Sequence, residues 1–268
     1  MKSSQRPASG TSYKLPEEAA RSGSNEVRLE HVTACRERFL HNHEDEVRGY
    51  SVETCLGTGG CSNAAVIDTG LADTIEKGLD ALDIRSRIRA KIQGPLKMHH
   101  EFRVSISQCP NACSRPQIVD VGLIGARIPQ VVEEACKGCM GCVEACREKA
   151  VSFWDKAPFP VIDSDRCLGC GACIAACPTG TIAEKATGYR ILVGGRLGRH
   201  PRLGSELPDV FSREDVERIV PACAGIFLDE GTGDERFGDL VERLGMDRLM
   251  SAVRRRWPRA PSERYRSG

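Results

Sequence analysis

Cysteine is the residue type that stands out in this chain of 268 residues, which contains 14 of them. Twelve of the cysteines fall into three groups of four with short or regular spacing. Clustered cysteines bind metal where thiols stay reduced, and form disulfides in secreted chains. Residues 1–24 are rich in Ser, Gly, Arg and Pro and contain no apolar stretch typical of a secretory signal. We therefore expect a cytoplasmic protein in which these cysteines bind metal.

Residues 131–186 consist of two similar halves, each with four cysteines separated by two, two and three residues. This is the spacing of two-cluster bacterial ferredoxins, in which the fourth cysteine of each run ligates the other cluster. Structural zinc instead uses CxxC pairs that are separated by a longer gap. We predict two [4Fe–4S] clusters, the first held by Cys136, Cys139, Cys142 and Cys177 and the second by Cys167, Cys170, Cys173 and Cys146. One departure is Arg147, which follows Cys146 where a proline is usual.

The remaining group of four has the less common spacings Cys55-x5-Cys61 and Cys109-x3-Cys113. On spacing alone these thiols predict an ordinary [4Fe–4S] site, because a set of thiolates does not specify a tetrapyrrole. Their surroundings are more specific. The segments Cys55-Leu-Gly-Thr-Gly-Gly-Cys61 and Ser107-Gln-Cys109-Pro-Asn-Ala-Cys113 resemble the siroheme-containing sulfite and nitrite reductase family.

Further stretches carry the same resemblance, which covers roughly residues 47–250. They are Phe102–Cys109, Val119–Gly125, Gly194–Gly198 and Asp234–Leu240. The resemblance implies a third [4Fe–4S] cluster on Cys55, Cys61, Cys109 and Cys113, with Cys113 bridging to the siroheme iron. It also implies an α+β fold, a siroheme/[4Fe–4S] domain with an inserted 2[4Fe–4S] ferredoxin-like domain, as known in anaerobic and dissimilatory branches of the family.

The implied reaction is the multi-electron reduction of a small oxyanion, sulfite to sulfide or nitrite to ammonia. A protein electron donor or partner redox subunit would supply electrons through the ferredoxin-type clusters. Siroheme carboxylates and an oxyanion substrate both require positive charge nearby. The candidate substrate-binding residues are Arg48, Lys97, Arg103 and Arg115. Arg196 and Arg199 are candidates for the siroheme carboxylates, and His99 and His100 for proton transfer.

Two departures from the family leave alternatives open. Glu101 replaces one basic residue of a basic–aromatic–basic triplet, which admits a different small substrate. The basic lobe that precedes the first cysteine pair in the family is short here, so we expect an oligomer or a partner that completes the pocket. The alternative function is an iron–sulfur electron-transfer subunit of a larger redox complex, without its own siroheme.

The elements that must position these residues show in the hydrophobic pattern. Apolar residues at helical spacing from Val66 to Leu82 predict a helix. Phe102–Ser107 alternates with period two and predicts a strand that leads into Cys109. We expect further strands at 118–124 and 189–193. Helices should begin at the capping boxes Ser212-x-x-Asp215 and Thr232-x-x-Glu235, and the second should end at Gly245.

Composition completes the expectations. A net charge of +1 does not favour nucleic-acid binding, and no apolar run is long enough to span a membrane. We expect Cys35 and Cys223 to be buried free thiols. The predicted organisation is a flexible extension at 1–30, the siroheme/[4Fe–4S] domain at 31–130 and 187–250, the ferredoxin domain at 131–186, and a basic tail at 251–268.

Overall fold

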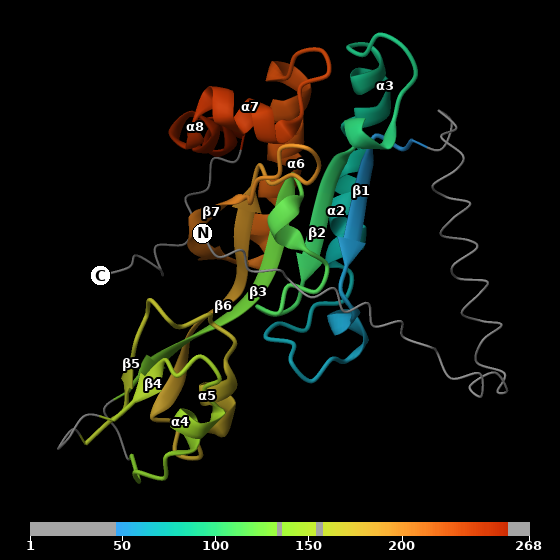
Figure 1. Ribbon diagram of the computed structural model, residues 1–268. Coiled ribbons are helices and arrows are strands. Elements are labelled where there is room, and N and C mark those ends of the chain that lie inside the picture. The colour runs from blue at the N-terminus through green and yellow to red at the C-terminus, as the bar shows by residue number, and fades with distance from the viewer. Residues whose placement is uncertain (1–46, 133–135, 154–157, 257–268) are drawn as a thin grey trace, which may run out of the picture. The chain divides into compact units, whose positions relative to one another are not determined.

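The computed structural model describes residues 47–132, 136–153 and 158–256 (Figure 1). Cys35 and the expected extension at 1–30 lie outside these residues. A five-stranded sheet has the order β1-β2-β3-β6-β7. The first three strands run parallel and the last two antiparallel to their neighbours. The strands are β1 Tyr50–Thr54, β2 Phe102–Ser107, β3 Val121–Val131, β6 Ile182–Val193 and β7 Ser205–Phe211.

Helices cover one face of this sheet, where Figure 1 shows α2 and α6 behind the strands. The helices of this part are α2 Leu71–Asp80, α3 Ile84–Arg89, α6 Arg213–Glu230, α7 Phe237–Leu244 and α8 Met246–Arg256. Phe102, Val104 and Ile106 of β2 belong to the same buried cluster as the apolar side chains of α6. The alternation of β2 therefore directs its apolar residues toward the helices.

The opposite face of the sheet is covered by the segment that follows Cys109. Ser105 Oγ donates a hydrogen bond to the Ser114 carbonyl at 2.6 Å, and Ser107 Oγ lies 2.7 Å from Ser114 Oγ. This segment contains a short 3₁₀ turn, η4 Pro116–Ile118. The polar residues of β2 thus point toward an irregular segment and hold it against the sheet.

The helix expected from Val66 to Leu82 is shorter than its pattern, because only Leu71–Asp80 is helical. Its buried side chains are Leu71, Ile75 and Leu79. Gly78 has a packing reason, since a Cβ at this position would lie 2.8 Å from Cγ of Pro221 in α6. The glycine allows α2 and α6 to approach closely.

The insertion extends from the middle of the sheet. β3 and β6 pair from Val121↔Val193 to Val131↔Ile182, with one shift of register between Ile128 and Pro129. Between these strands lie two short helices, α4 Gly141–Ala145 and α5 Ala172–Ala176, and a pair of two-residue strands, β4 Val151–Ser152 and β5 Val161–Ile162. The two halves of the sequence repeat thus share one local plan.

Other sequence predictions agree with the structure or need correction. β2, the end of β6 before Gly194, the Ser212 capping box and the stop at Gly245 are confirmed. β3 begins at Val121 rather than 118, because η4 occupies the preceding residues. The Thr232–Glu235 motif forms a turn instead of the start of a helix, and α7 begins at Phe237.

Some elements were not anticipated. β1, β7, α3 and the three-residue η3 Met98–His100 carry no strong periodic signal, and α8 runs into the segment expected as a tail. Ala252 and Val253 of α8 are buried, so its apolar face belongs to the sheet core. Among the described residues, no helix is long and apolar enough to cross a membrane.

Candidate functional site

The first group of cysteines stands at the carboxyl ends of two adjacent parallel strands. Cys55 follows β1, and Cys109 follows β2 after one residue. The Cys55 N–H donates to the Ile106 carbonyl at 3.0 Å, which ties the two strand ends together. Cys55 Sγ accepts N–H groups of Gly57 and Gln108, each at 3.3 Å. Such donors stabilise an anionic sulfur, as a metal-bound thiolate requires.

The structure brings all four thiols of this group together. Burial raises the pKa of the Cys109 thiol, and charge on Cys55, Cys113 and Cys61 raises it further. Cys109 is buried, whereas Cys61 and Cys113 are exposed. No three His, Cys, Asp or Glu side chains among the described residues surround the position of a single metal ion. A cubane is larger than one ion, so its thiolates stand farther apart, and the donor set fits it.

Gln108 anchors the site and was missed by the sequence analysis. Its Nε2 donates to the Asp68 carbonyl at 3.2 Å, and its Oε1 lies 3.3 Å from the Tyr189 hydroxyl. A Cβ on Gly125 would lie 2.5 Å from the Gln108 carbonyl oxygen. A glutamine that immediately precedes a candidate ligand indicates such a network only once the strands that surround it are known.

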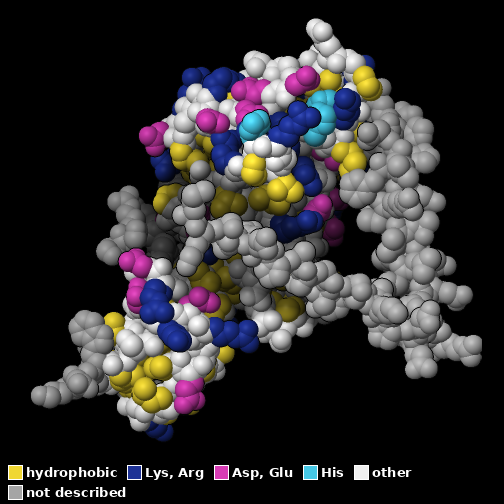
Figure 2. All heavy atoms as spheres, in the orientation of Figure 1, with side chains coloured by type: hydrophobic (Ala, Val, Ile, Leu, Met, Phe, Trp, Pro, Cys, Tyr) yellow, Lys and Arg dark blue, Asp and Glu magenta, His cyan; other side chains and the backbone are white. Residues whose placement is uncertain are grey.

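Two of the predicted substrate-binding residues lie on the helix-free face of the sheet. Arg103 of β2 has Nη2 4.0 Å from Glu53 Oε1 of β1. Arg115, two residues after Cys113, is exposed with φ of 57°, and no ion pair of Arg115 is recorded among the described residues. Figure 2 shows Lys and Arg side chains interspersed with Asp and Glu across this view rather than gathered in one patch. Positive charge beside Cys113 therefore comes from individual residues such as Arg115 and not from an extended basic patch.

The other two candidates lie at the amino-terminal end of the sheet, where Arg103, the second residue of β2, also stands. Arg48 precedes β1 and Lys97 precedes β2. The seven residue steps from Arg48 to Cys55 correspond to about 23 Å of extended chain. Arg48 donates to the Tyr50 hydroxyl at 2.7 Å and pairs with Glu76 at 3.6 Å, whereas Lys97 is exposed. Arg48 is thus held against α2, whereas Arg103 shares the helix-free face of the sheet with Arg115.

The Gly194–Gly195 turn leads into a loop that carries Arg196 and Arg199. Arg196 forms an ion pair with Asp239 of α7, and its Nε donates to the His200 carbonyl at 2.8 Å. Arg199 is exposed, and no ion pair is recorded for it within the described ranges. Arg196 is therefore already neutralised by its neighbour, and Arg199 is the better placed of the two to meet a carboxylate.

In the insertion, the structure groups the cysteines across the two halves. Cys136, Cys139, Cys142 and Cys177 line one cavity of about 280 Å³. Burial raises the pKa of Cys173 to about 11, and charge on Cys167, Cys170 and Cys146 adds to this. Burial acts to raise the pKa of Cys177 as well, but hydrogen bonds from Ile182, Thr179 and Gly180 lower it to about 7. Both groupings contain one cysteine from the other half, as a two-cluster arrangement requires.

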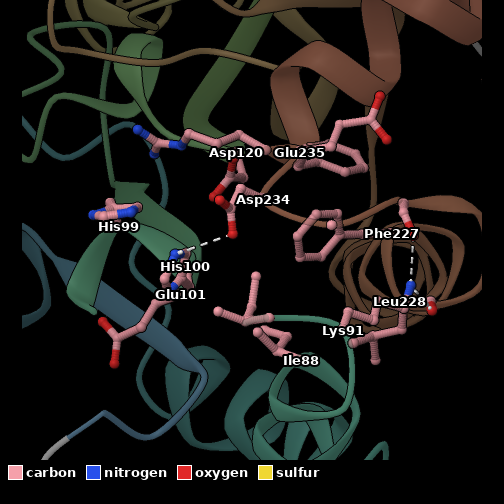
Figure 3. Close-up of a pocket in the computed structure, with 15 residues that line it drawn as sticks. Ile88, Lys91, His99, His100, Glu101, Asp120, Phe227, Leu228, Asp234 and Glu235 are labelled. Atoms are coloured by element: carbon pink, nitrogen blue, oxygen red, sulfur yellow. Dashed lines mark hydrogen bonds and ion pairs between the residues drawn. The ribbon is translucent and has the colours of Figure 1, made fainter. Parts of the chain in front are cut away.

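A separate pocket of about 430 Å³ lies at the amino-terminal edge of β2 (Figure 3). Asp120 is buried there and accepts the Arg103 N–H through Oδ2 at 2.8 Å, while Oδ1 has no hydrogen-bond partner in the described part of the chain. Burial raises its pKa to about 6. His100 Nε2 lies 3.9 Å from Asp234 Oδ1, and burial lowers the pKa values of His99 and His100. The histidine pair thus lies at the edge of the sheet away from the cysteines.

Glu101, the departure from the family triplet, has a local partner. Its Oε1 accepts the Arg48 N–H at 3.2 Å, and burial raises its pKa. The carboxylate holds the segment that leads into β1 against the start of β2.

Comparisons with known proteins agree with this arrangement. The family model described as "Nitrite and sulphite reductase 4Fe-4S domain" matches residues 47–260. The chain belongs to this family. Its mixed α+β fold is the fold of that domain.

Several proteins are similar to the chain. It is 33% identical over 202 residues to Coenzyme F420-dependent sulfite reductase of Methanocaldococcus jannaschii, covering 75% of this chain and 30% of that protein. It is 27% identical over 138 residues to one subunit of the anaerobic sulfite reductase of Salmonella typhimurium, covering 46% of this chain and 36% of that protein. The crystal structure of dissimilatory sulfite reductase I has a TM-score of 0.52 at 17% identity and covers 82% of this chain and 56% of its own, which shows a shared fold. The chain therefore spans about a third of the length of these two curated relatives.

Proposed function

We propose that this chain is a siroheme-dependent reductase that carries out the multi-electron reduction of sulfite to sulfide or nitrite to ammonia. The observation that supports this best is the group of four thiols at the ends of β1 and β2. One of its two exposed members, Cys113, lies two residues before Arg115 on the helix-free face. The relatives are named as sulfite reductases, which favours sulfite.

The residues of this face fit the proposed cofactor. Leu56 and Ile67, near the same cysteines in sequence, are 91% and 74% exposed and offer apolar surface to a flat ring system. Cys113 would be the shared thiolate of cluster and siroheme, and Arg199 would meet a siroheme carboxylate. When bound, siroheme and its cluster would supply electrons at a single iron beside the substrate.

The chain's own residues would bind the oxyanion and hold it in place. A guanidinium donates paired hydrogen bonds to an oxyanion and carries a permanent charge. Arg115 is exposed and Arg103 has only a long contact with Glu53, so both are free to serve. We assign Arg103 and Arg115 to the substrate. We place Arg48 further from it because its side chain pairs with Glu76 of α2, and Lys97 because it lies before the start of β2.

The two cysteine groups of the insertion would hold [4Fe–4S] clusters that relay single electrons from a protein donor or partner redox subunit. The Arg127 N–H of β3 donates to the Gly169 carbonyl at 2.7 Å, next to Cys170. One cluster would therefore lie directly against the strand that continues into the sheet.

The proposal is tested first by absorption spectra of the anaerobically purified protein and its Cys113→Ser variant. We expect a siroheme Soret band and a red band in the parent, and the perturbation of these bands together with the nearby cluster in the variant. The matched control is Cys139→Ser, which should damage an insertion cluster but leave the siroheme bands unchanged. An unchanged siroheme spectrum in Cys113→Ser would overturn the bridging assignment.

Substrate binding is tested separately with two arginine variants. Arg103→Ala should raise KM for the oxyanion by roughly 10- to 100-fold, which is the loss of one charge-assisted hydrogen bond. Arg48→Ala is the matched control and should leave KM near that of the parent, because Arg48 pairs with Glu76 and Tyr50. Equal effects of both substitutions would contradict the assignment.

A second candidate function is an electron-transfer subunit without siroheme. The exposure of Cys61 and Cys113 also suits a cluster that passes electrons to a partner across an open face. A spectrum with only the broad absorption of iron–sulfur clusters, from a protein purified out of a host that makes siroheme, would favour this candidate.

A further inference from the structure

The two halves of the insertion have matching backbones after their fourth cysteines. Cys146 ends α4 and Cys177 ends α5, both with extended backbone. Three residues later Lys149 and Gly180 have φ of 52° and 75°, and a strand follows in each half. Counting from the cysteines, Glu148 in the first half corresponds to Thr179 in the second.

The sulfur atoms of these two cysteines have different surroundings. Cys177 Sγ accepts the Ile182 N–H at 3.4 Å and lies 3.6 Å from the Thr179 hydroxyl. The Thr179 hydroxyl lies 2.9 Å from the Thr181 hydroxyl, and Thr181 is buried. Since a ligating thiolate carries no proton, Thr179 must donate to the sulfur, and its oxygen is then free to accept from Thr181.

The first half has no hydroxyl at the corresponding place. Cys146 Sγ accepts the Ala150 N–H at 3.2 Å, and Glu148 is exposed. A carboxylate donates no hydrogen bond, and its negative charge opposes the addition of an electron nearby. The two cluster sites therefore differ by one hydroxyl donor and one acidic side chain on the same backbone plan.

The same two sites also differ in their position relative to the sheet. The site with Cys167, Cys170 and Cys173 lies against β3, where Arg127 forms an isolated bridge with Cys170. The pKa of Arg190 in β6 is raised chiefly by its hydrogen bond to Glu206, and charge on Cys167 adds to this rise. The cavity of the other site is lined by residues between 136 and 182, of which only Ile182 belongs to a strand of the five-stranded sheet. We call the first the inner site and the second, which contains Cys177, the outer site.

We propose that Thr179, supported by Thr181, raises the reduction potential of the outer cluster above that of the inner cluster, so that the first electron rests on the outer cluster. This inference rests on the proposed function, because it requires both clusters. One electron comes from an external protein donor and is added to the cluster, and no bond or proton changes place. Hydrogen bonds to cluster sulfur stabilise the extra negative charge and raise the potential. The outer site would then store an electron next to the donor until the inner site passes it on.

The test is a redox titration of the full-length, anaerobically purified protein, followed by the EPR signals of the reduced clusters. Thr179→Val keeps the shape of the side chain and removes the hydroxyl. It should shift the midpoint potential of the outer cluster, the higher of the two insertion midpoints, to a lower value and leave that of the inner cluster in place. Thr179→Ser restores a hydroxyl and should keep the parent values. Glu148→Thr adds a donor and removes a charge in the first half, and should shift the lower midpoint upward.

Three outcomes are distinguishable. If the midpoint potentials of both insertion clusters stay at the parent values in Thr179→Val and in Glu148→Thr, with iron content equal to the parent, the inference is overturned while the relay remains intact. A protein that never shows two cubane signals would contradict the proposed function instead. If Thr179→Val fails to assemble its cluster, the upward shift in Glu148→Thr still decides, because that variant affects the other site.

Discussion

The sheet-borne cysteines and the insertion cysteines are held in different ways. Among the described residues the sheet has a core of 33 buried residues, from Val47 to Val253, and its cysteines stand at the rim of this core. The described part of the insertion has a cluster of four buried residues, two of which are Cys142 and Cys173 themselves. We therefore expect the sheet to form its cysteine site before any cofactor binds, and the insertion to depend on the clusters proposed for it for much of its stability.

Removal of iron should show the largest difference between the two regions. After chelation, hydrogen exchange of residues 136–182 should accelerate by on the order of 100-fold or more, because the fold of such a small unit is coupled to its metal. Amides of β2 and of the first half of β3 should keep most of their protection. Mass-spectrometric exchange on protein with and without iron measures this, and uniform acceleration across both regions would contradict the comparison.

The sheet core should respond most to loss of apolar volume. Leu123→Ala, at a fully buried position of β3, should lower the free energy of unfolding by about 2–5 kcal/mol. Val161→Ala in β5 is the control, since Val161 is 38% exposed and should cost well under half as much. Urea titrations give both values. Equal losses in the free energy of unfolding would mean that Val161 contributes as much packing energy as a fully buried core residue, which contradicts the comparison.

The large core also tolerates a buried carboxyl. The pKa of Asp120 is about 6 in the fold against an ordinary value of 3.8, so its contribution to stability is complete below pH 4 and is lost as pH rises through 6. Asp120→Asn should therefore match the parent near pH 4 and be more stable above pH 6, by at most about 3 kcal/mol. Thermal melts across this range test the sign. The prediction is wrong if the stability of the variant minus that of the parent is smaller at pH 7 than at pH 4.

The smallest expected effects concern two corresponding positions in the insertion. Met140 and Gly171 precede α4 and α5 with φ of 60° and 74°. Met140→Gly should stabilise the insertion by about 1 kcal/mol, because a side chain is strained in this conformation. Gly171→Ala should destabilise it by more, since its Cβ would also lie 2.9 Å from Cβ of Arg127. The temperature at which iron is released compares the two, and effects of the same sign would contradict this reasoning.

Much of this architecture could be predicted from the sequence. The alternation in Phe102–Ser107 and the box at Ser212 are local signals, and both gave the right element. The spacing of the insertion cysteines predicts ligand sets that cross the halves, and one such set lines a single cavity, while the clusters themselves stay a prediction. These signals succeed because they depend on neighbours a few residues away.

The rest depended on contacts between distant segments. Arg48 and Arg103 look equivalent in sequence, and both stand near the amino-terminal ends of parallel strands, but Arg48 pairs with Glu76 of α2 whereas Arg103 lies on the opposite face of the sheet. The Thr232 motif itself forms a turn, and α7 starts at Phe237, two residues after Glu235. The partnership of Gln108 with Asp68 and Tyr189 joins segments up to 121 residues apart and has no local signature.

The long pairing of β3 with β6 bears on how such a chain could arise. Because Val131 and Ile182 are direct partners, the insertion leaves and returns at neighbouring positions of one antiparallel ribbon. Such ends can be joined by a tight hairpin turn without moving the strands. The insertion could thus be gained or lost in a single genetic event, and an engineered chain with a short turn in its place would retain every residue of the sheet.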